Sequence, residues 1–507
     1  MYKIALIQPI VTLGKAIRIE KSPTGIQNIS SYLKEKHYNV KMFHRKVDSS
    51  LFKDLFDFEA DIIGISSFTV SYPAAKNIAD TIKKNKADTP IILGGWHASG
   101  CAISYMEGYE RWSLREILNK NSSFDYIVVG EGEIIFKQLI EKIKKYSKED
   151  LLKQLEDMKG IGYILPDNTI VVSRAERIKC IDSLPFPDWN DLDIDIYRDK
   201  RDSKNLDLSV HLQRGCRYNC TFCQTPKSFP GNIVRINSMD SVSNYIDYLI
   251  KKFSPTIITF TDEDFMSNIE WVTALCQMII KKEYNKKVRF DSFASITDID
   301  RFEKKNVLTL MKKAGFFSFF AGIESFNKKT LKIYERPLLN KKDINEYINL
   351  VQHAVYISKK NGLILMADYM IGFFFETEYE ARTGFEQLKL IKGIPYIYLP
   401  IFTPFPGTKL WKIALEKDLL LKKDGKIPWE LYDCSHQVTK LDYNLTSLRE
   451  ELEQSFYTSK QYKENMVSDI KQNKQILDII YLPLFRKLCL DYPDNKELKS
   501  IFLQLSK

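Results

Sequence analysis

The chain has 507 residues, of which 44% are hydrophobic and 28% are charged, a composition typical of a folded globular protein. This excludes a disordered, collagenous or low-complexity chain, and no stretch approaches the roughly 18 to 20 apolar residues that cross a bilayer. The net charge of +10 arises from lysines that are scattered along the chain rather than gathered in a block. We therefore expect no nucleic-acid partner, although the excess of positive charge would suit an anionic substrate.

The first 145 residues alternate short apolar runs with amphipathic segments, which predicts strands separated by helices. The predicted strands are Lys3–Gln8, Val40–Phe43, Asp61–Ser66, Pro90–Leu93 and Asp125–Val129. Such a series forms a parallel, doubly wound sheet of the α/β class. In these sheets the ligand crevice lies beyond the carboxyl ends of the strands.

Polar and glycine-rich loops follow three of these strands and are candidates for ligand binding. They comprise Ser66, Ser67, Phe68 and Thr69; Gly94, Gly95, Trp96 and His97; and Gly130, Glu131 and Gly132. Glycine lets backbone amides approach a ligand closely, but glycines that simply end strands are an alternative of equal weight. The GxGxxG fingerprint is absent, so the pattern does not predict a dinucleotide site.

Residues 146–205 are predicted to connect two domains, with a hairpin over residues 160–173 and a proline-punctuated linker over residues 184–189. A second strand–helix series over residues 206–425 predicts a partial (β/α)6 barrel with its chemistry at the carboxyl ends of the strands. Its strands are expected at Ser209–Gln213, Thr256–Phe260, Val288–Phe293, Phe317–Ile323, Leu363–Ile371 and Tyr396–Phe402. Residues 426–507 are predicted to be helical and to cover the mouth of the barrel.

Three of the eight cysteines, Cys216, Cys220 and Cys223, follow the first predicted barrel strand with the spacing CxxxCxxC. Three thiolates in one loop can hold an iron–sulfur cluster, and the lack of a nearby fourth cysteine leaves one iron open to another ligand. No CxxC or CxxH pair follows at zinc-finger distance, which argues against a structural zinc site. The five scattered cysteines are expected to be ordinary thiols.

The cysteine loop resembles that of the radical S-adenosylmethionine superfamily, and the likeness extends to the class with an N-terminal cobalamin-binding domain. It is carried further by residues 23–26, 94–98, 130–133, 184–187, 322–325 and 403–408. The resemblance implies a Rossmann-like cobalamin domain (1–145), a connector (146–205), a radical barrel (206–425) and a helical C-terminal region (426–507). It also implies three cofactors: a 4Fe–4S cluster on the three cysteines, S-adenosylmethionine on the open iron, and cobalamin.

The same resemblance assigns residues to S-adenosylmethionine. Phe222 is expected near the adenine, with Gly322 and Glu324 ending the fourth barrel strand and Thr403 and Pro404 ending the sixth. A structural carboxylate is the alternative for Glu324, and a plain turn is the alternative for residues 403–408. Asp262 and Glu263 either orient S-adenosylmethionine or substrate, or cap the following helix.

Cobalamin is assigned to the three glycine-rich and polar loops of the first domain. The Asp-x-His-x-x-Gly motif of mutase-type domains is absent, so we expect no histidine on the lower face of the cobalt. His97 is either a contact to the corrin or a structural histidine. In the barrel, residues 372–377 read Gly-Phe-Phe-Phe-Glu-Thr and lack the Pro-Gly turn of many relatives, so the phenylalanines form either a substrate wall or a packed turn.

The resemblance implies that reductive cleavage of S-adenosylmethionine gives a 5′-deoxyadenosyl radical. The leading prediction is methylation of an unactivated carbon of a small molecule. Oxidative cyclisation, ring contraction or rearrangement with the same cofactors is the alternative, and a non-catalytic cobalamin or redox sensor is a weaker one. We expect a reductant such as flavodoxin or ferredoxin as partner, and a cytoplasmic location because the thiolates need a reducing compartment.

Overall fold

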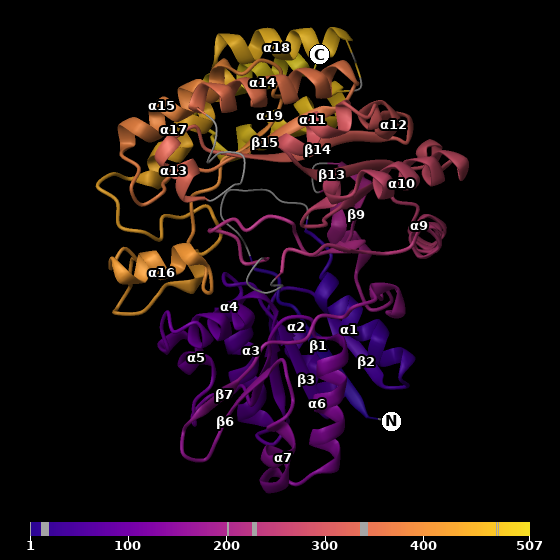
Figure 1. Cartoon of the computed structure of the whole chain (residues 1–507), viewed down its shortest axis with the longest axis vertical. Coiled ribbons are helices and arrows are strands. Elements are labelled where there is room, and N and C mark those ends of the chain that lie inside the picture. Colours follow the sequence, from indigo (N-terminus) through magenta and orange to yellow (C-terminus); the bar gives the residue numbers. More distant parts are fainter. Residues whose placement is uncertain are drawn as a thin grey trace.

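The computed structural model describes residues 2–11, 20–199, 202–225, 231–334, 343–472, 474 and 476–506. Two seven-stranded sheets form its frame, in the orders β2-β1-β3-β4-β5-β6-β7 and β16-β15-β14-β13-β12-β9-β8. The first sheet and its helices form the lower half of Figure 1, and the second sheet with its helices forms the upper half. Among the described residues, no helix is both long and apolar enough to span a membrane.

The first sheet begins with five parallel strands, which agree with the predicted ones. They are β1 (Lys3–Ile7), β2 (Asn39–Phe43), β3 (Ile62–Ser66), β4 (Ile91–Gly94) and β5 (Tyr126–Val128). The strand order reverses between β1 and β3, and such a switch point opens a crevice at the carboxyl ends. Helices cover both faces, so successive β1 residues are buried in two different cores.

The helices of this half are α1 (Thr24–Glu35), α2 (Ser49–Phe58), α3 (Tyr72–Asn85), α4 (Gly95–Met106), α5 (Trp112–Ile117), α6 (Glu133–Lys145) and α7 (Lys148–Leu155). The predicted hairpin forms β6 (Ile161–Ile164) and β7 (Ile170–Val172), which join the first sheet in antiparallel pairing after β5. The predicted boundary at residue 145 places this hairpin in the connector, whereas its backbone hydrogen bonds tie it to the first sheet.

The second sheet contains six parallel strands, as the partial (β/α)6 barrel requires. They are β9 (Asp202–Val210), β12 (Ile257–Phe260), β13 (Arg289–Ser295), β14 (Phe316–Glu324), β15 (Ile364–Tyr369) and β16 (Ile397–Tyr398), with the short β8 (Arg198–Asp199) antiparallel to β9. A separate ribbon pairs β10 (Gln213–Arg214) with β11 (Arg235–Ile236) beside the cysteine loop. The predicted fold class is therefore confirmed.

The outer layer of the barrel consists of helices that follow the strands. They are α9 (Met239–Phe253), α10 (Ile269–Lys281), α11 (Ile296–Glu303), α12 (Val307–Lys313), α13 (Lys328–Ile333), α14 (Ile344–Lys360) and α15 (Glu378–Leu390). Residues that point to this layer are fully buried, such as Phe319 and Ala321, while the alternate residue Phe320 is partly exposed on the inner face of the barrel. The inner face is thus open to a ligand.

The C-terminal helices α17 (Leu445–Thr458), α18 (Lys460–Gln472), α19 (Leu482–Asp491) and α20 (Lys496–Leu505) lie at the top of Figure 1, away from the first domain. Tyr457 donates a hydrogen bond to the carbonyl of Ile397 in the edge strand β16 (3.2 Å), and Lys359 of α14 pairs with Asp469 of α18 (2.6 Å). These helices pack on the edge strand and the outer layer of the barrel, whereas the sequence predicted that they cover its mouth. Because β16 is an edge strand, Tyr457 supplies the Ile397 N–H and carbonyl with the partner that a further strand would give.

The segment that does cross from the barrel to the first domain contains α16 (Lys409–Glu416). Gly407 donates its N–H to Ser104 Oγ of α4 (2.9 Å), and the ring of Trp429 meets that of His97 edge-on at 4.9 Å. Trp112, Trp411 and Trp429 pack together at this contact, with ring centroids about 6 Å apart. This aromatic cluster holds one side of the interface between the two halves.

Candidate functional site

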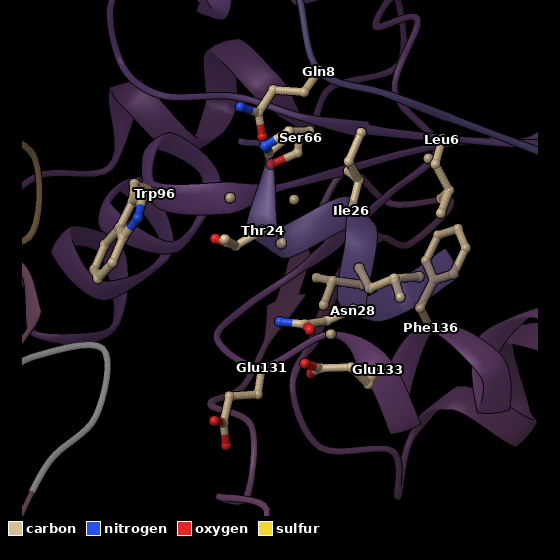
Figure 2. A pocket seen from close by; sticks show the side chains of 18 of the residues that line it. Leu6, Gln8, Thr24, Ile26, Asn28, Ser66, Trp96, Glu131, Glu133 and Phe136 are labelled. Atoms are coloured by element: carbon tan, nitrogen blue, oxygen red, sulfur yellow. The ribbon is translucent and has the colours of Figure 1, made fainter. Parts of the chain in front are cut away.

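A cavity of about 220 Å³ lies where the carboxyl ends of β1, β3, β4 and β5 face the barrel. Figure 2 shows Leu6, Ile26 and Phe136 together at one end, Trp96 at the other, and Glu131 close to Glu133 along the edge. The cavity lining is therefore apolar at both ends, with two acids along one edge. The barrel contributes His211, Arg214 and Glu263 to the same lining.

Most of the loop residues assigned to cobalamin from the sequence line this cavity. Those that do so are Ser66, Phe68, Gly94, Gly95, Trp96, Gly130, Glu131 and Gly132. Gly95 begins α4 with a φ of +89°, and a Cβ at this position would lie 2.6 Å from the carbonyl oxygen of Ser67. Only glycine fits there without strain, so the start of α4 can lie directly against the strand ends.

Ser67, Thr69 and His97 are buried and do not belong to the cavity lining. Ser67 donates its backbone N–H to Gly94 and accepts from the N–H of His97, so it joins β3 to α4 (3.1 and 3.2 Å). His97 stacks on Tyr72 with ring centroids 4.2 Å apart, and its Nδ1 lies 3.4 Å from Thr69 Oγ1. Of the two alternatives for His97, the packing favours the structural one.

We expect acid to destabilise the fold through His97. Burial lowers the pKa of His97 from 6.5 to about 3, so between these values the unfolded chain takes up a proton that the folded chain does not. The stability that neutral His97 contributes is complete above pH 6.5 and is lost as the pH falls, at about 1.4 kcal/mol per unit. Urea unfolding should show that the unfolding free energy falls between pH 7 and pH 5 by about 2 kcal/mol more in the wild type than in His97→Phe. Equal losses would contradict this expectation.

The three predicted cluster cysteines lie in the loop that follows β9 and passes through the β10–β11 ribbon. Each is partly buried, and burial raises the pKa of the Cys216 thiol to about 12, with smaller contributions from Asp264 and from the other two thiols. The described residues contain no set of three or more His, Cys, Asp or Glu side chains arranged around a single metal ion. A cluster does not need such an arrangement, because each thiolate binds a different iron.

Three consecutive acids after β12 hold this loop from the barrel side. Asp262 Oδ1 accepts hydrogen bonds from the N–H groups of Leu212 and Gln213, both at 2.6 Å. Glu263 Oε2 accepts from His211 Nε2 at 2.9 Å and from the N–H of Gly215 at 3.3 Å. These contacts give Asp262 and Glu263 a role in shaping the cysteine loop, and neither side chain caps the next helix.

The third acid, Asp264, forms a two-point ion pair with Arg217, the residue after Cys216. Arg217 Nε and Nη2 donate to its two carboxylate oxygens at 2.7 and 2.9 Å, and Nη2 also donates to Asp298 of α11 at 2.8 Å. Such planar, two-point pairing fixes direction as well as distance. The loop is therefore held on both sides of Cys216.

Asp262 is fully buried, and burial raises its pKa to about 7 even though its hydrogen bonds favour the ionised form. The second oxygen, Oδ2, is buried with no hydrogen-bond partner among the described residues. Glu263 behaves in the opposite way: burial raises its pKa, but the charge and the hydrogen bond of His211, together with hydrogen bonds from backbone N–H groups, outweigh burial, so the pKa is lowered. His211 and Glu263 thus form an ionic pair at the cavity wall.

The remaining residues assigned to S-adenosylmethionine are spread over the carboxyl ends of the barrel strands. Phe222 packs edge-on against Tyr334 at 4.8 Å. Glu324 is buried and adopts a left-handed backbone conformation with φ 69°, which is unfavourable for a non-glycine residue and typical of functional sites. Gly322 lies in β14 just before it, while Thr403 and Pro404 lie in the loop that reaches α4; Thr403 is buried and donates to the carbonyl of Ile401 (3.1 Å).

The three phenylalanines of the loop after β15 differ in exposure. Phe373 and Phe374 are buried and pack on Phe402 with ring centroids 5.1 Å apart, while Phe375 is 40% exposed. Glu376 accepts a hydrogen bond from the N–H of Gly372 at 2.9 Å and so closes the turn that lacks a Pro-Gly pair. The first two phenylalanines therefore form a packed turn, not a substrate wall.

Several residues of the site carried no assignment from the sequence, among them His211, Arg214 and Glu133. Arg214 Nη1 lies 3.1 Å from Glu131 Oε1, and its Nη2 lies 2.7 Å from Glu133 Oε1. The partners are separated by more than 80 residues in the chain, so no local spacing reveals them. Their only sequence signal is that His211 and Arg214 stand beside the cysteine loop.

Known families match both halves of the chain. The family model of the B12 binding domain matches residues 12–140, and that of the radical SAM superfamily matches residues 210–381. The chain belongs to the cobalamin-binding radical S-adenosylmethionine enzymes. The predicted family and cofactors are therefore confirmed, and the enzyme uses cobalamin, S-adenosylmethionine and a 4Fe–4S cluster.

Individual relatives agree with this placement. The enzyme is 26% identical to an uncharacterized methyltransferase of Pyrococcus horikoshii, over 87% of this chain and 88% of the relative. It is 23% identical to the bacteriochlorophyllide d C-8(2)-methyltransferase of Chlorobaculum tepidum, over 88% and 86% of the two chains. A solved structure of the cobalamin-dependent S-adenosylmethionine radical enzyme OxsB shares the fold, with a TM-score of 0.64, 18% identity and coverage of 100% of this chain and 75% of that one.

The residues of the site fit these cofactors. Gly94 lines the cavity, and a Cβ at this position would stand in open space at the strand ends, so the backbone there is accessible to a ligand. The cavity would receive cobalamin at this edge, with the barrel residues His211, Arg214 and Glu263 facing it. The loop offers three thiols. Three thiolates can bind three of the four irons of a cluster and leave the fourth iron open to another ligand.

Proposed function

We propose that the enzyme transfers a methyl group to an unactivated carbon of a small-molecule substrate. One observation carries the proposal: residues of the cobalamin domain and residues beside the cysteine loop line the same cavity. A substrate in the barrel therefore lies between the two cofactor sites. When bound, the cluster with S-adenosylmethionine supplies hydrogen abstraction from carbon and the cobalamin supplies the methyl group. The two methyltransferase relatives support this choice.

In this proposal, the parts of the chain have separate roles. Cys216, Cys220 and Cys223 hold the cluster, and the loops after β3, β4 and β5 hold the cobalamin. Phe222, Gly322, Glu324, Thr403 and Pro404 surround S-adenosylmethionine. Asp262, Glu263 and Asp264 keep the cysteine loop in place and limit the access of water to it, since Asp262 and Asp264 are buried.

The inner face of the barrel offers an apolar wall to the substrate. Phe293 of β13 is 38% exposed there, and its ring meets that of Phe320 edge-on at 5.7 Å. The ring centroids of Phe320 and Tyr398 of β16 are 6.1 Å apart. Large apolar side chains seldom stay exposed on the inside of a fold unless they contact a ligand. We therefore propose a substrate with an extended apolar or aromatic part.

The enzyme needs an electron donor, and we propose a flavodoxin or ferredoxin for this role. Cluster thiolates also need a reducing environment, for which we propose the cytoplasm. We also propose that the domains end at residues 145, 205 and 425. The β6–β7 hairpin of the connector then pairs with β5 of the first domain.

Methyl-labelled S-adenosylmethionine tests the reaction. The anaerobically reconstituted enzyme is incubated with a reductant and fractionated metabolites, and products are followed by mass spectrometry. We expect a product that carries the label together with 5′-deoxyadenosine. 5′-Deoxyadenosine with an altered but unlabelled product would instead establish cyclisation or rearrangement. Neither 5′-deoxyadenosine nor a product, in a protein with full cluster and cobalamin, would favour a sensor.

A further inference from the structure

Four charged side chains bridge the cobalamin domain and the ribbon beside the cysteine loop. The β10–β11 register places Arg214 directly opposite Arg235, and like charges in this position repel. Glu131 of the cobalamin domain lies between them, with Oε1 3.1 Å from Arg214 Nη1 and Oε2 2.7 Å from Arg235 Nη1. The ribbon thus needs a carboxylate from the other domain in order to pair.

The bridge is extended at both ends. Arg214 Nη2 donates to Glu133 Oε1, the first residue of α6, at 2.7 Å. Glu131 Oε2 also accepts the N–H of Ile178 in the connector at 2.9 Å. Side-chain exposure is 14% for Arg214, 9% for Arg235, and 4% and 6% for the two glutamates, so water screens these charges little.

We infer that Arg214 is a positioning residue that fixes the cysteine loop against the cobalamin domain through Glu131 and Glu133. Arg214 stands two residues before Cys216, and both glutamates line the cavity where the cobalamin loops end. A rigid link at this place sets the spacing and orientation between the cluster and the cobalamin. Glu131, assigned to cobalamin from the sequence, would act through this link. The inference requires the two cofactors but not methyl transfer, so it goes beyond the proposed function.

The opposite side of the interface is held by the aromatic cluster of Trp112, Trp411 and Trp429. Removal of Arg214 should therefore leave the domains attached while the cysteine loop loses its fixed position. Arg174 provides a matched control, because it pairs with Glu107 outside the cysteine loop and both side chains are about one-third exposed. An exposed pair of this kind contributes little.

The test measures the distance between the reduced cluster and cob(II)alamin by pulsed electron paramagnetic resonance in the reconstituted holoprotein. We expect a narrow distribution in the wild type and in Arg174→Gln, and a distribution at least about twice as wide in Arg214→Gln. Affinity for hydroxocobalamin should fall in Arg214→Gln, since the two glutamates at the edge of the cavity lose the cation that holds them in place. Iron content and the spectrum of the cluster should stay unchanged.

If the distance distribution in Arg214→Gln is as narrow as in the wild type, the inference is overturned. If that variant does not take up a cluster, Glu133→Gln decides, because it removes one partner and leaves the Glu131–Arg235 pair in place; an unchanged width there overturns the inference as well. Arg214→Lys should lie between the wild type and Arg214→Gln, since lysine keeps the charge but cannot pair with both carboxylates in the fixed geometry of a guanidinium. If the distance distribution is as wide in Arg214→Lys as in Arg214→Gln, this result would contradict the inference.

Discussion

A Cys220→Ala variant is expected to form no detectable 5′-deoxyadenosine. Two thiolates cannot hold a 4Fe–4S cluster with an open iron in the way that three can, and without that iron S-adenosylmethionine is not bound for reductive cleavage. The fold should survive, because the loop is held by the acids after β12 and not by the cysteines. Iron and sulfide content, cluster absorbance and mass spectrometry of 5′-deoxyadenosine check this result.

The same loss is expected for Cys216→Ala and Cys223→Ala. Cys180 gives the matched control, since it is an exposed cysteine outside the loop, and Cys180→Ala should keep full cluster content and activity. A Cys220→Ala protein that keeps wild-type iron content and cleaves S-adenosylmethionine would refute the cluster assignment. Loss of cluster in Cys180→Ala would point to a cysteine that the spacing does not reveal.

Asp262→Ala is expected to cost about 2 to 6 kcal/mol of unfolding free energy and most of the cluster. The substitution leaves the N–H groups of Leu212 and Gln213 buried without an acceptor, and each unsatisfied group costs about 1 to 3 kcal/mol. Asp262→Asn keeps an acceptor oxygen for both N–H groups but places its NH2 group where Oδ2 has no partner among the described residues, so this variant should lose less stability and less cluster than the alanine variant. Urea unfolding and iron content measure both effects.

This pair of variants also separates the role that the structure indicates for Asp262 from the contact to S-adenosylmethionine that the sequence allowed. If the side chain holds the cysteine loop, the alanine variant loses stability and cluster, and the asparagine variant binds S-adenosylmethionine with nearly normal affinity. If the side chain contacts S-adenosylmethionine instead, the asparagine variant loses that affinity while its stability is unchanged. The second outcome would contradict the role inferred from the two 2.6 Å hydrogen bonds.

The barrel strands illustrate how far sequence periodicity reaches. The predicted strand at 396–402 is reduced to Ile397–Tyr398, and beyond it Ile401 still pairs with Ile371 after β15 as an isolated parallel bridge. The predicted first strand at 209–213 begins earlier, at Asp202, where it gains a partner in β8. In both cases, the apolar pattern identified the strand, but its ends depend on neighbours that lie far away in the sequence.

His97 shows a similar limit at the site. The sequence placed it in a strand-end loop beside Gly95 and Trp96, which both line the cavity. In the structure, His97 lies in the first turn of α4, and its ring points away from the cavity. It packs between the rings of Tyr72 and Trp429. Neighbours in a loop therefore need not share a ligand, since a helix directs successive side chains to different faces.

The sequence by itself determined the two-part α/β architecture and the family, and it predicted the cluster ligands. Strand–helix alternation depends on local periodicity, and the three cysteines lie in one loop, so neither needs a distant partner to be recognised. Only the tertiary structure decided which loop residues face the cavity and which acids hold the cysteine loop. It also decided the bridge from Arg214 to Glu131 and Glu133, because charges more than 80 residues apart meet only when the two domains pack together.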